Sequence, residues 1–158
     1  KPIDTIISRA LLETLIYVAV YILLMVIVCL SGEFFEIKNL LLLAVSWTLL
    51  VLFSCGMGLI FMVIGKMIPE TQKFLPILLK PLYFISGIMF PLHSVPKDYW
   101  PYLLWNPILH VVELSREAVM PGYNSDEISL GYLLVSTIVV IFLGLALYRT
   151  NEKAMLTS

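Results

Sequence analysis

Charged residues are scarce in this sequence. They make up 13% of its 158 residues, against about 25% in a typical soluble domain. Hydrophobic residues reach 60%, whereas soluble domains contain about 45–50%. A soluble chain of this length would form one domain around one core, and too few polar side chains are present to cover such a core. The composition therefore excludes an ordinary soluble protein.

Histidine, cysteine and catalytic motifs are equally sparse. His110 and Glu113 can share one face of a helix, but metal sites usually need about three or four ligands, and the only other histidine is His93. Cys29 and Cys55 are expected at different depths of neighbouring helices, which argues against a disulfide. The sequence also lacks a phosphate-binding motif, a nucleophile triad and a paired-carboxylate site. We therefore expect no metal site and no catalytic residue in this chain.

Long uncharged runs are the main positive feature. Residues 14–32, 39–65 and 128–148 contain no Asp, Glu, Lys or Arg, and each run exceeds the roughly 18 residues that indicate a membrane-spanning helix. The first run lacks a small-residue cleavage site and further spans follow it, so it is not a signal peptide. These runs predict an integral membrane protein that crosses the bilayer several times.

The placement of positive charges predicts the topology. One set of span ends carries most of the cations, namely Lys1, Arg9, Lys66, Lys73, Arg149 and Lys153. Because cytoplasmic loops are enriched in Lys and Arg, both termini and the 66–73 loop are predicted to be cytoplasmic. An even number of crossings is then required, so residues 74–92 must cross as well. We predict an all-α polytopic helical bundle, a single transmembrane domain with spans at about residues 10–31, 39–65, 74–92 and 128–148.

Lys80 is the unusual residue of the third predicted span, where it precedes Pro81. A helix beginning at Lys80 would give only about 21 Å against a hydrocarbon core of roughly 30 Å, so the helix should begin near Phe74 and contain Lys80. One interpretation is that the lysine stem bends back to the headgroups. The other is that Lys80 faces a hydrated conduit, because Pro81 leaves the Ile77 carbonyl without its helical donor.

The segment between the last two spans is rich in aromatic and proline residues. The stretch "SVPKDYWPYLLWNP" has the aromatic density of an interfacial belt, carried by Tyr99, Trp100, Tyr102 and Trp105. Asn106 then has the position of an N-cap, with Pro107 as the first helical residue. The following "PILHVVELSREAV" predicts an amphipathic helix that "MPG" ends. Because it is too short to span, this helix is expected to lie at the outer surface or to dip partway in.

The charged side of this outer helix has two possible roles. Glu113, Arg116 and Glu117 share one side with His110. They either form a solvated face with ion pairs worth about 0–1 kcal/mol, or hold two copies of the helix together in a partly desolvated place.

Two further patterns concern helix contacts. Tyr17 and Tyr21 lie on one face of the first span, where they either pack with bonded hydroxyls or form a channel face that stacks on sugar rings. Ser54 and Gly58 fit the small-xxx-small pattern of close helix contact.

Three long strings resemble a known family. They are "LPILLKPLYFISGIMFPLHSVPKDYW", "WNPILHVVELSREAVMPGY" and "ALYRTNEKAMLTS", and they are similar to the KpsM-type membrane subunit of bacterial capsular polysaccharide exporters, in the ABC-2 class. The resemblance implies a six-span subunit that forms a dimer around a polysaccharide channel. A separate cytoplasmic ATPase, KpsT, binds the ATP and Mg, so no cofactor is expected in this chain. Short outer helices between the last two spans form a periplasmic gate, which corresponds here to about residues 91–120.

The resemblance therefore implies a permease subunit that exports capsular polysaccharide across the bacterial inner membrane. The implied partners are a KpsT-like ABC ATPase subunit, a second copy of the chain, a lipid-linked polysaccharide substrate and periplasmic export proteins, with no nucleic acid. The channel or gate candidates are Lys80, Tyr83, Tyr99, Trp100, Trp105, Glu113, Arg116, Glu117, Tyr17 and Tyr21. The resemblance also implies that this chain corresponds to the last four of the six spans, and that the family's amino-terminal interfacial helix and first two spans are not part of it.

Two alternative functions stay open at this point. An ABC-2 exporter of another glycan, a lipid or a drug would share the same architecture. A secondary transporter would place titratable groups at mid-membrane, often on broken helices in matching halves. The latter fits less well, because the only charged residues inside the predicted spans are Glu13 and Lys80, both towards the cytoplasmic end, and no internal repeat is visible.

Overall fold

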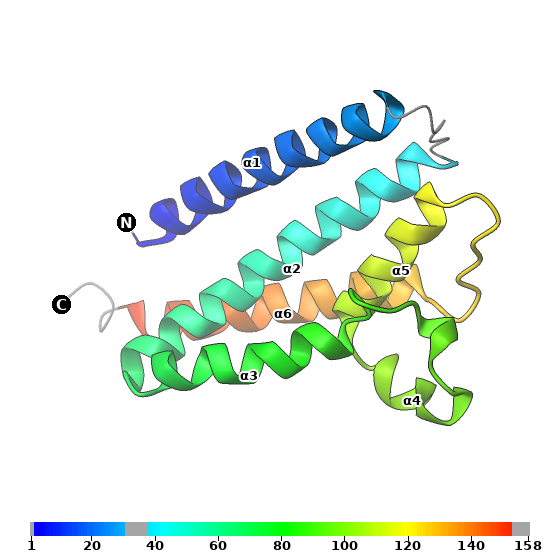
Figure 1. Ribbon diagram of the computed structural model, residues 1–158. Helices are drawn as coiled ribbons and strands as arrows, with labels where there is room; N and C mark the ends of the chain where they lie inside the picture. Colours follow the sequence, from blue (N-terminus) through cyan, green and yellow to red (C-terminus); the bar gives the residue numbers. More distant parts are fainter. Residues whose placement is uncertain (1, 31–37, 153–158) are drawn as a thin grey trace.

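The computed structural model describes residues 2–30 and 38–152, and all of its regular elements are helical (Figure 1). They are α1 (Pro2–Leu30), α2 (Leu40–Met67), α3 (Thr71–Ile85), the 3-10 turns η1 (Leu92–Ser94) and η2 (Lys97–Tyr99), α4 (Trp100–Leu103), α5 (Pro107–Val119) and α6 (Leu130–Thr150). The predictions that involve Lys1, Lys153 and the Cys29 side chain lie outside the described residues. The predicted all-α class is confirmed.

Among the described residues, two helices are long and apolar enough to cross a membrane. They are α2, with 28 residues, and α6, with 21 residues. At about 1.5 Å per residue, α6 is about 31 Å long, close to the roughly 30 Å of a hydrocarbon core. In α1, the stretch Leu11–Leu23 is also apolar. The crossings predicted at residues 10–31 and 74–92 therefore remain predictions.

Helix α3 differs from its predicted extent. It begins at Thr71 and contains Lys80, as expected, but it ends at Ile85 and not near residue 92. The cause is the turn at Gly87, whose φ of +69° is the left-handed conformation that commonly follows the end of a helix. Its 15 residues extend about 22 Å, so a crossing at 74–92 would also need the non-helical residues after Ile85.

Helices α2 and α6 pack closely through glycine. A Cβ on Gly144 would lie 2.8 Å from the carbonyl oxygen of Gly56, and a Cβ on Gly56 would lie 2.9 Å from the Val140 side chain. Ser54 and Gly58, whose spacing predicts a close contact with another helix, do not make that contact with α6. Residues two positions apart point to nearly opposite sides of a helix, and a Cβ on Gly58 would meet nothing within 4 Å.

Helix α5 lies against one end of this α2–α6 pair. Val111 and Leu114 of α5 pack with Leu49 of α2 and Leu133 of α6 in one buried cluster. The Asn39 N–H, just before α2, donates to the carbonyl of Ala118 at 3.1 Å. The amphipathic helix predicted from the sequence is therefore formed, and its apolar side contributes to the core of the bundle.

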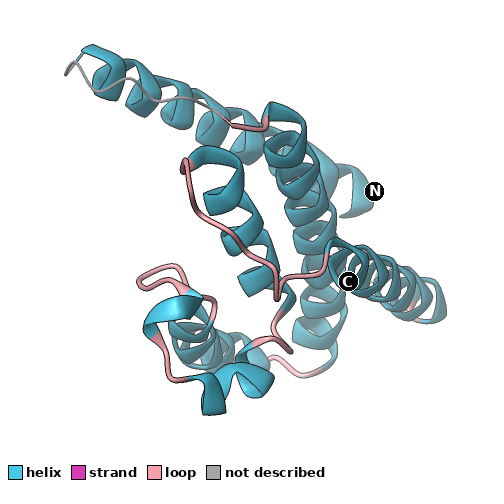
Figure 2. Cartoon of the chain, turned by 90° about the vertical axis from the view of Figure 1, so that its right-hand side faces the viewer, coloured by secondary structure: helices cyan, strands magenta, loops and turns pink. Residues whose placement is uncertain are grey.

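The two ends of the bundle carry different elements. The start of α1, the end of α6 and the turn between α2 and α3 lie at one end, whereas α4 and α5 lie at the other (Figure 1). Figure 2 looks onto this second end, which carries loops and short helices. We call it the outer end. The span ends that were predicted to be cationic lie together at the opposite end of the bundle. Those within the described residues carry Arg9, Lys66, Lys73 and Arg149.

Candidate functional site

The turn that ends α3 meets α5 at the outer end. Gly87 lies so close to α5 that a Cβ on it would be 2.4 Å from Cδ1 of Leu109. Glycine is therefore required here for two reasons, the positive φ and the contact. Any larger residue would push α5 away from the end of α3.

Asn106 connects the same two helices with its side chain. Its amide oxygen accepts a hydrogen bond from the Ile108 N–H at 3.0 Å, which confirms it as the N-cap of α5. Its amide nitrogen donates to the Ser86 hydroxyl at 3.0 Å, and that hydroxyl donates to the Leu82 carbonyl at 2.6 Å. One cap residue therefore fixes the start of α5 and joins it to the end of α3.

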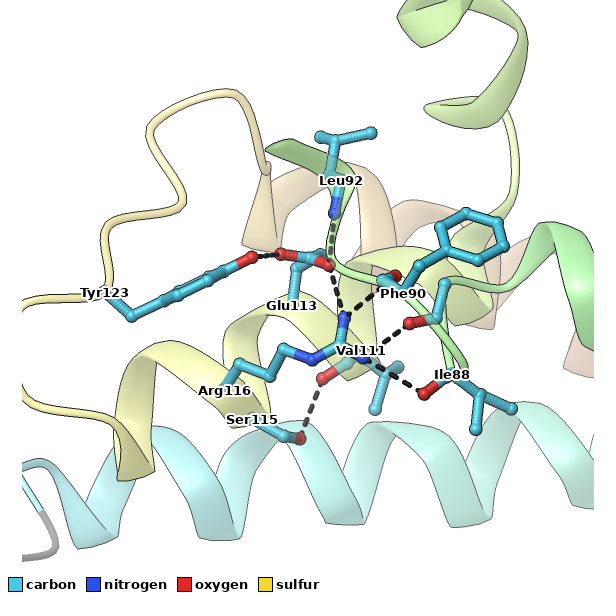
Figure 3. A network of polar contacts seen from close by, with 9 residues as sticks. Ile88, Phe90, Leu92, Val111, Glu113, Ser115, Arg116 and Tyr123 are labelled. Atoms are coloured by element: carbon cyan, nitrogen blue, oxygen red, sulfur yellow. Dashed lines mark hydrogen bonds and ion pairs between the residues drawn. The ribbon is translucent and has the colours of Figure 1, made fainter. Parts of the chain in front are cut away.

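Glu113 is the centre of a buried polar network (Figure 3). Its side chain is 0% exposed. Its Oε1 accepts hydrogen bonds from Arg116 Nη1 at 2.6 Å and from the Leu92 N–H at 3.1 Å. The Tyr123 hydroxyl donates to Oε2. Burying an ion costs several kcal/mol unless partners compensate it, and three donors do so here. The interpretation of these charges as a solvated face is therefore wrong for Glu113.

Arg116 extends the network to the backbone that follows α3. Its Nη2 donates to the carbonyls of Gly87 at 2.6 Å and Ile88 at 3.1 Å, and Nη1 lies 3.5 Å from the carbonyl of Phe90. The guanidinium group has five N–H donors in one plane, so one side chain can bind the carboxylate and these carbonyls together. Its positive charge is also favourable close to a helix C-terminus.

Tyr123 completes the network from the connection between α5 and α6. Burial and the hydrogen bond to Glu113 raise the pKa of Tyr123 to about 12, so the phenol keeps its proton at neutral pH and remains a donor. Glu117, one turn along α5, accepts a hydrogen bond from the Ser125 hydroxyl of the same connection. The charged side of α5 therefore holds its own chain together.

His110 forms a second polar link, from α5 to α6. His110 is 3% exposed. The Ser129 N–H donates to Nδ1 at 3.2 Å, so the ring proton lies on Nε2, which is 2.8 Å from the carbonyl of Leu104 and donates to it. Burial lowers the pKa of His110, which keeps the imidazole neutral.

The aromatic residues predicted as gate candidates differ in their surroundings. The Trp100 indole N–H donates to the Val95 carbonyl at 2.9 Å, and the Lys97 ammonium lies 5.6 Å from the centre of its ring. Trp100 therefore fixes the loop before α5. Tyr99 and Trp105 point outward instead, and Trp105 is 82% exposed.

The remaining candidates lie away from the Glu113 network. On α1, Tyr21 packs edge-on against Trp47 of α2, with ring centroids 4.7 Å apart, whereas Tyr17 is exposed. On α3, Lys80 and Tyr83 are exposed. The partly buried residues of α3 share the opposite side from Lys80 by helical geometry; they are Thr71, Leu75 and Leu82.

Sequence reasoning found the charged residues of this network but missed two of their partners, Gly87 and Tyr123, and also missed Ser86, the partner of Asn106. Ser86 and Gly87 follow α3, and Tyr123 follows α5, so no spacing in the sequence joins them to Asn106, Arg116 and Glu113. The one available signal was Gly87, because glycine after an apolar run often ends a helix.

Comparisons with known proteins agree with this architecture. The family described as "ABC-2 type transporter" matches residues 1–120. The chain is 73% identical over 158 residues to the polysialic acid transport protein KpsM of Escherichia coli, covering 100% of this chain and 61% of that protein. It is 28% identical to the capsule polysaccharide export inner-membrane protein BexB of Haemophilus influenzae, covering 98% of this chain and 58% of the relative.

A third relative is the capsule polysaccharide export inner-membrane protein CtrC of Neisseria meningitidis serogroup A. It is 25% identical to this chain, with 98% of the chain and 58% of the relative covered. The chain thus spans about three fifths of the length of these relatives. Because the family match extends over most of the described helices, the chain belongs to the ABC-2 type transporter family of membrane proteins.

Proposed function

We propose that the protein represented by this chain is the membrane subunit of an ATP-driven exporter that carries capsular polysaccharide across the bacterial inner membrane. The observation that carries the proposal is the 73% identity, over all 158 residues, to a polysialic acid transport protein. More distant relatives with capsule-export names support the same substrate class. Within this function the chain supplies membrane helices and the outer end, while ATP is hydrolysed on a separate KpsT-like subunit.

The proposed assembly contains two copies of the full-length subunit around a channel, four crossings from this chain in each copy, and periplasmic export proteins beyond it. The position of the described termini at one end of the bundle supports cytoplasmic ends for α1 and α6 (Figure 1). The outer end then faces the periplasm, where a lipid-linked polysaccharide would leave.

The segment at residues 91–120 is proposed as the periplasmic gate. Supporting this, α5 joins the end of α3 through Arg116 and through Asn106. A movement of α3 would therefore be transmitted to α5 directly. In this proposal Glu113 and Arg116 act inside one subunit as the connection, and the exposed Tyr99 and Trp105 contact the surroundings, either lipid headgroups or sugar.

Lys80 is proposed to line the conduit. It lies on the side of α3 opposite the partly buried Leu75 and Leu82, and Tyr83 is exposed on the same helix. A cation at this depth is favourable where it contacts water or an anionic group. A polymer with carboxylates, such as the one in the name of the E. coli relative, would provide such groups.

The function is tested by genetic complementation. A capsulated strain that lacks its own membrane subunit receives the full-length protein together with its ATPase, and surface polymer is measured. Restored surface capsule supports the proposal. Absence of surface polymer together with normal amounts of both subunits in the membrane would contradict it, and export of a different glycan would assign the substrate differently.

A further inference from the structure

A groove between α1 and α2 lies apart from the outer end and from the proposed gate. Its volume is about 510 Å³, within the roughly 300–1,000 Å³ of ligand sites. It is lined on α1 by residues between Arg9 and Val18, and on α2 by residues between Trp47 and Gly58.

The groove has one defined end. The edge-on contact of Tyr21 with Trp47 joins the two helices at its outer limit. At the other limit, a Cβ on Gly58 would meet nothing within 4 Å, so the space is open beside α2. From Arg9 to Tyr21 the helix rises about 18 Å, which suits an extended acyl chain more than a compact solute.

The chemistry of the lining changes along this length. The part nearer the Tyr21–Trp47 contact is apolar, with Val18, Leu50 and Val51. The other end carries Arg9 and Glu13, one cation and one anion a helical turn apart. Arg before Glu is the less favourable order for an i,i+4 pair, and among described residues the structure shows no ion pair for either side chain.

We infer that this groove is a binding site for a phospholipid with an ethanolamine headgroup. The phosphate binds the Arg9 guanidinium, the ammonium binds the Glu13 carboxylate, and one acyl chain lies along the apolar part between α1 and α2. The adjacent opposite charges of the site match a zwitterionic headgroup. An anionic lipid would supply a phosphate for Arg9 but no cation for the Glu13 carboxylate. The inference rests on the proposed membrane orientation, which places Arg9 at the cytoplasmic leaflet, but it does not depend on which polymer is exported.

The test measures lipid retention by native mass spectrometry of the full-length protein. The protein is extracted from vesicles of phosphatidylethanolamine and phosphatidylglycerol, and the bound lipids are identified. The wild type should retain phosphatidylethanolamine selectively. Gly58→Leu fills the groove and should weaken this retention at least about tenfold, whereas Gly131→Leu, at an exposed helical glycine of α6, should leave it unchanged. Glu13→Gln should remove the preference for ethanolamine, and Arg9→Gln should weaken retention of both lipids.

A photo-crosslinking residue at Ser54, which also lines the groove, identifies the occupant directly. A phospholipid adduct supports the inference. An adduct to another segment of the same protein or to a second copy would overturn it, as would equal lipid retention by Gly58→Leu and the wild type. Export is assayed in parallel, so loss of lipid retention with normal export, or the reverse, separates this site from the proposed function.

Discussion

Arg116 of α5 donates to the carbonyl oxygen of Gly87, 29 positions earlier in the chain, across 2.6 Å. The same guanidinium binds Glu113, which is completely buried. A charge pair that looks like a surface feature in the sequence therefore connects two helices at the outer end. Its effect depends on both partners, because each would be a buried or partly buried ion without the other.

Removal of Arg116 is expected to destabilise the protein strongly. Arg116→Ala leaves the Glu113 carboxylate buried without its cation, which costs about 3–5 kcal/mol in comparable pairs. Arg149→Ala, at an exposed arginine of α6, should change stability by less than about 0.5 kcal/mol. The measurement is chemical unfolding of the full-length protein in detergent, alongside surface capsule in cells. Similar stability of the two variants would contradict the role of this pair.

The combination Glu113→Gln with Arg116→Ala separates the two contributions of Arg116. The double variant no longer buries an unpaired carboxylate, so it should recover part of the stability lost in Arg116→Ala. It still lacks the bonds to the carbonyls of Gly87 and Ile88, so it should remain below the wild type. Complete recovery would show that these backbone contacts contribute nothing.

Alanine substitutions at Gly87 and Gly122 should differ in their cost to stability. Both have a positive φ, +69° and +81°, but a Cβ would strike Leu109 only at Gly87 and would meet nothing within 4 Å at Gly122. Gly122→Ala should therefore cost only the backbone strain, about 1–3 kcal/mol, and Gly87→Ala more. Adding Leu109→Ala to Gly87→Ala relieves the clash and makes the two losses less than additive. Equal losses at the two glycines would contradict the close packing of α5 on α3.

His110 predicts a dependence of stability on pH. Because burial lowers the pKa of His110, the unfolded chain binds a proton below about pH 6.5 while the folded chain does not. The contribution of this histidine to stability should therefore be complete above about pH 6.5 and should decrease as the pH falls from there towards the lowered folded-state pKa. Thermal unfolding between pH 5 and 8 measures the effect, and His110→Gln should flatten the curve.

The control for this titration is His93, the other histidine, which is exposed. His93→Gln should keep the same slope as the wild type between pH 5 and 7. If the change of stability with pH instead disappears in His93→Gln and persists in His110→Gln, the assignment of this titration to His110 is wrong.

The proposed orientation predicts which surface positions are accessible from outside. In the full-length protein without its native cysteines, a cysteine at Lys38 or Asn124 should react with an impermeant thiol reagent added to cells with a permeabilised outer membrane. A cysteine at Lys73 or Asn151 should react only after the inner membrane is opened. Labelling of Asn151→Cys in intact spheroplasts would contradict an even number of crossings.

Helix type and approximate position were predictable from this sequence, because long uncharged runs and caps are local signals. The N-cap at Asn106, the helical start at Pro107 and the stop at "MPG" all follow from neighbouring residues. The end of α3 was not predicted, because hydrophobicity continues past the turn at Gly87 and conceals it.

The burial of Glu113 could not be read from the sequence. A helical wheel places Glu113, Arg116 and Glu117 on one polar side, and polar sides usually face water. Here the turn after α3 and the Tyr123 segment cover that side, and both come from distant parts of the chain. The close contact of α2 with α6 was missed for a related reason, since Gly56, Ser54 and Gly58 all suit helix packing and only the position of α6 selects Gly56.

Helix α5 has hydrogen bonds to three other helices or to residues at their ends: to α2 through Asn39, to α3 through Asn106 and Arg116, and to α6 through His110 and Ser129. All of these hydrogen bonds hold one helix of 13 residues. If one of them lengthens because α5 moves, the others must lengthen as well. Packed interfaces of this kind change between discrete arrangements instead of deforming continuously. If the outer end is the proposed gate, it should therefore have a threshold: a small force on α3 leaves the contacts of α5 in place, and a larger one breaks them together.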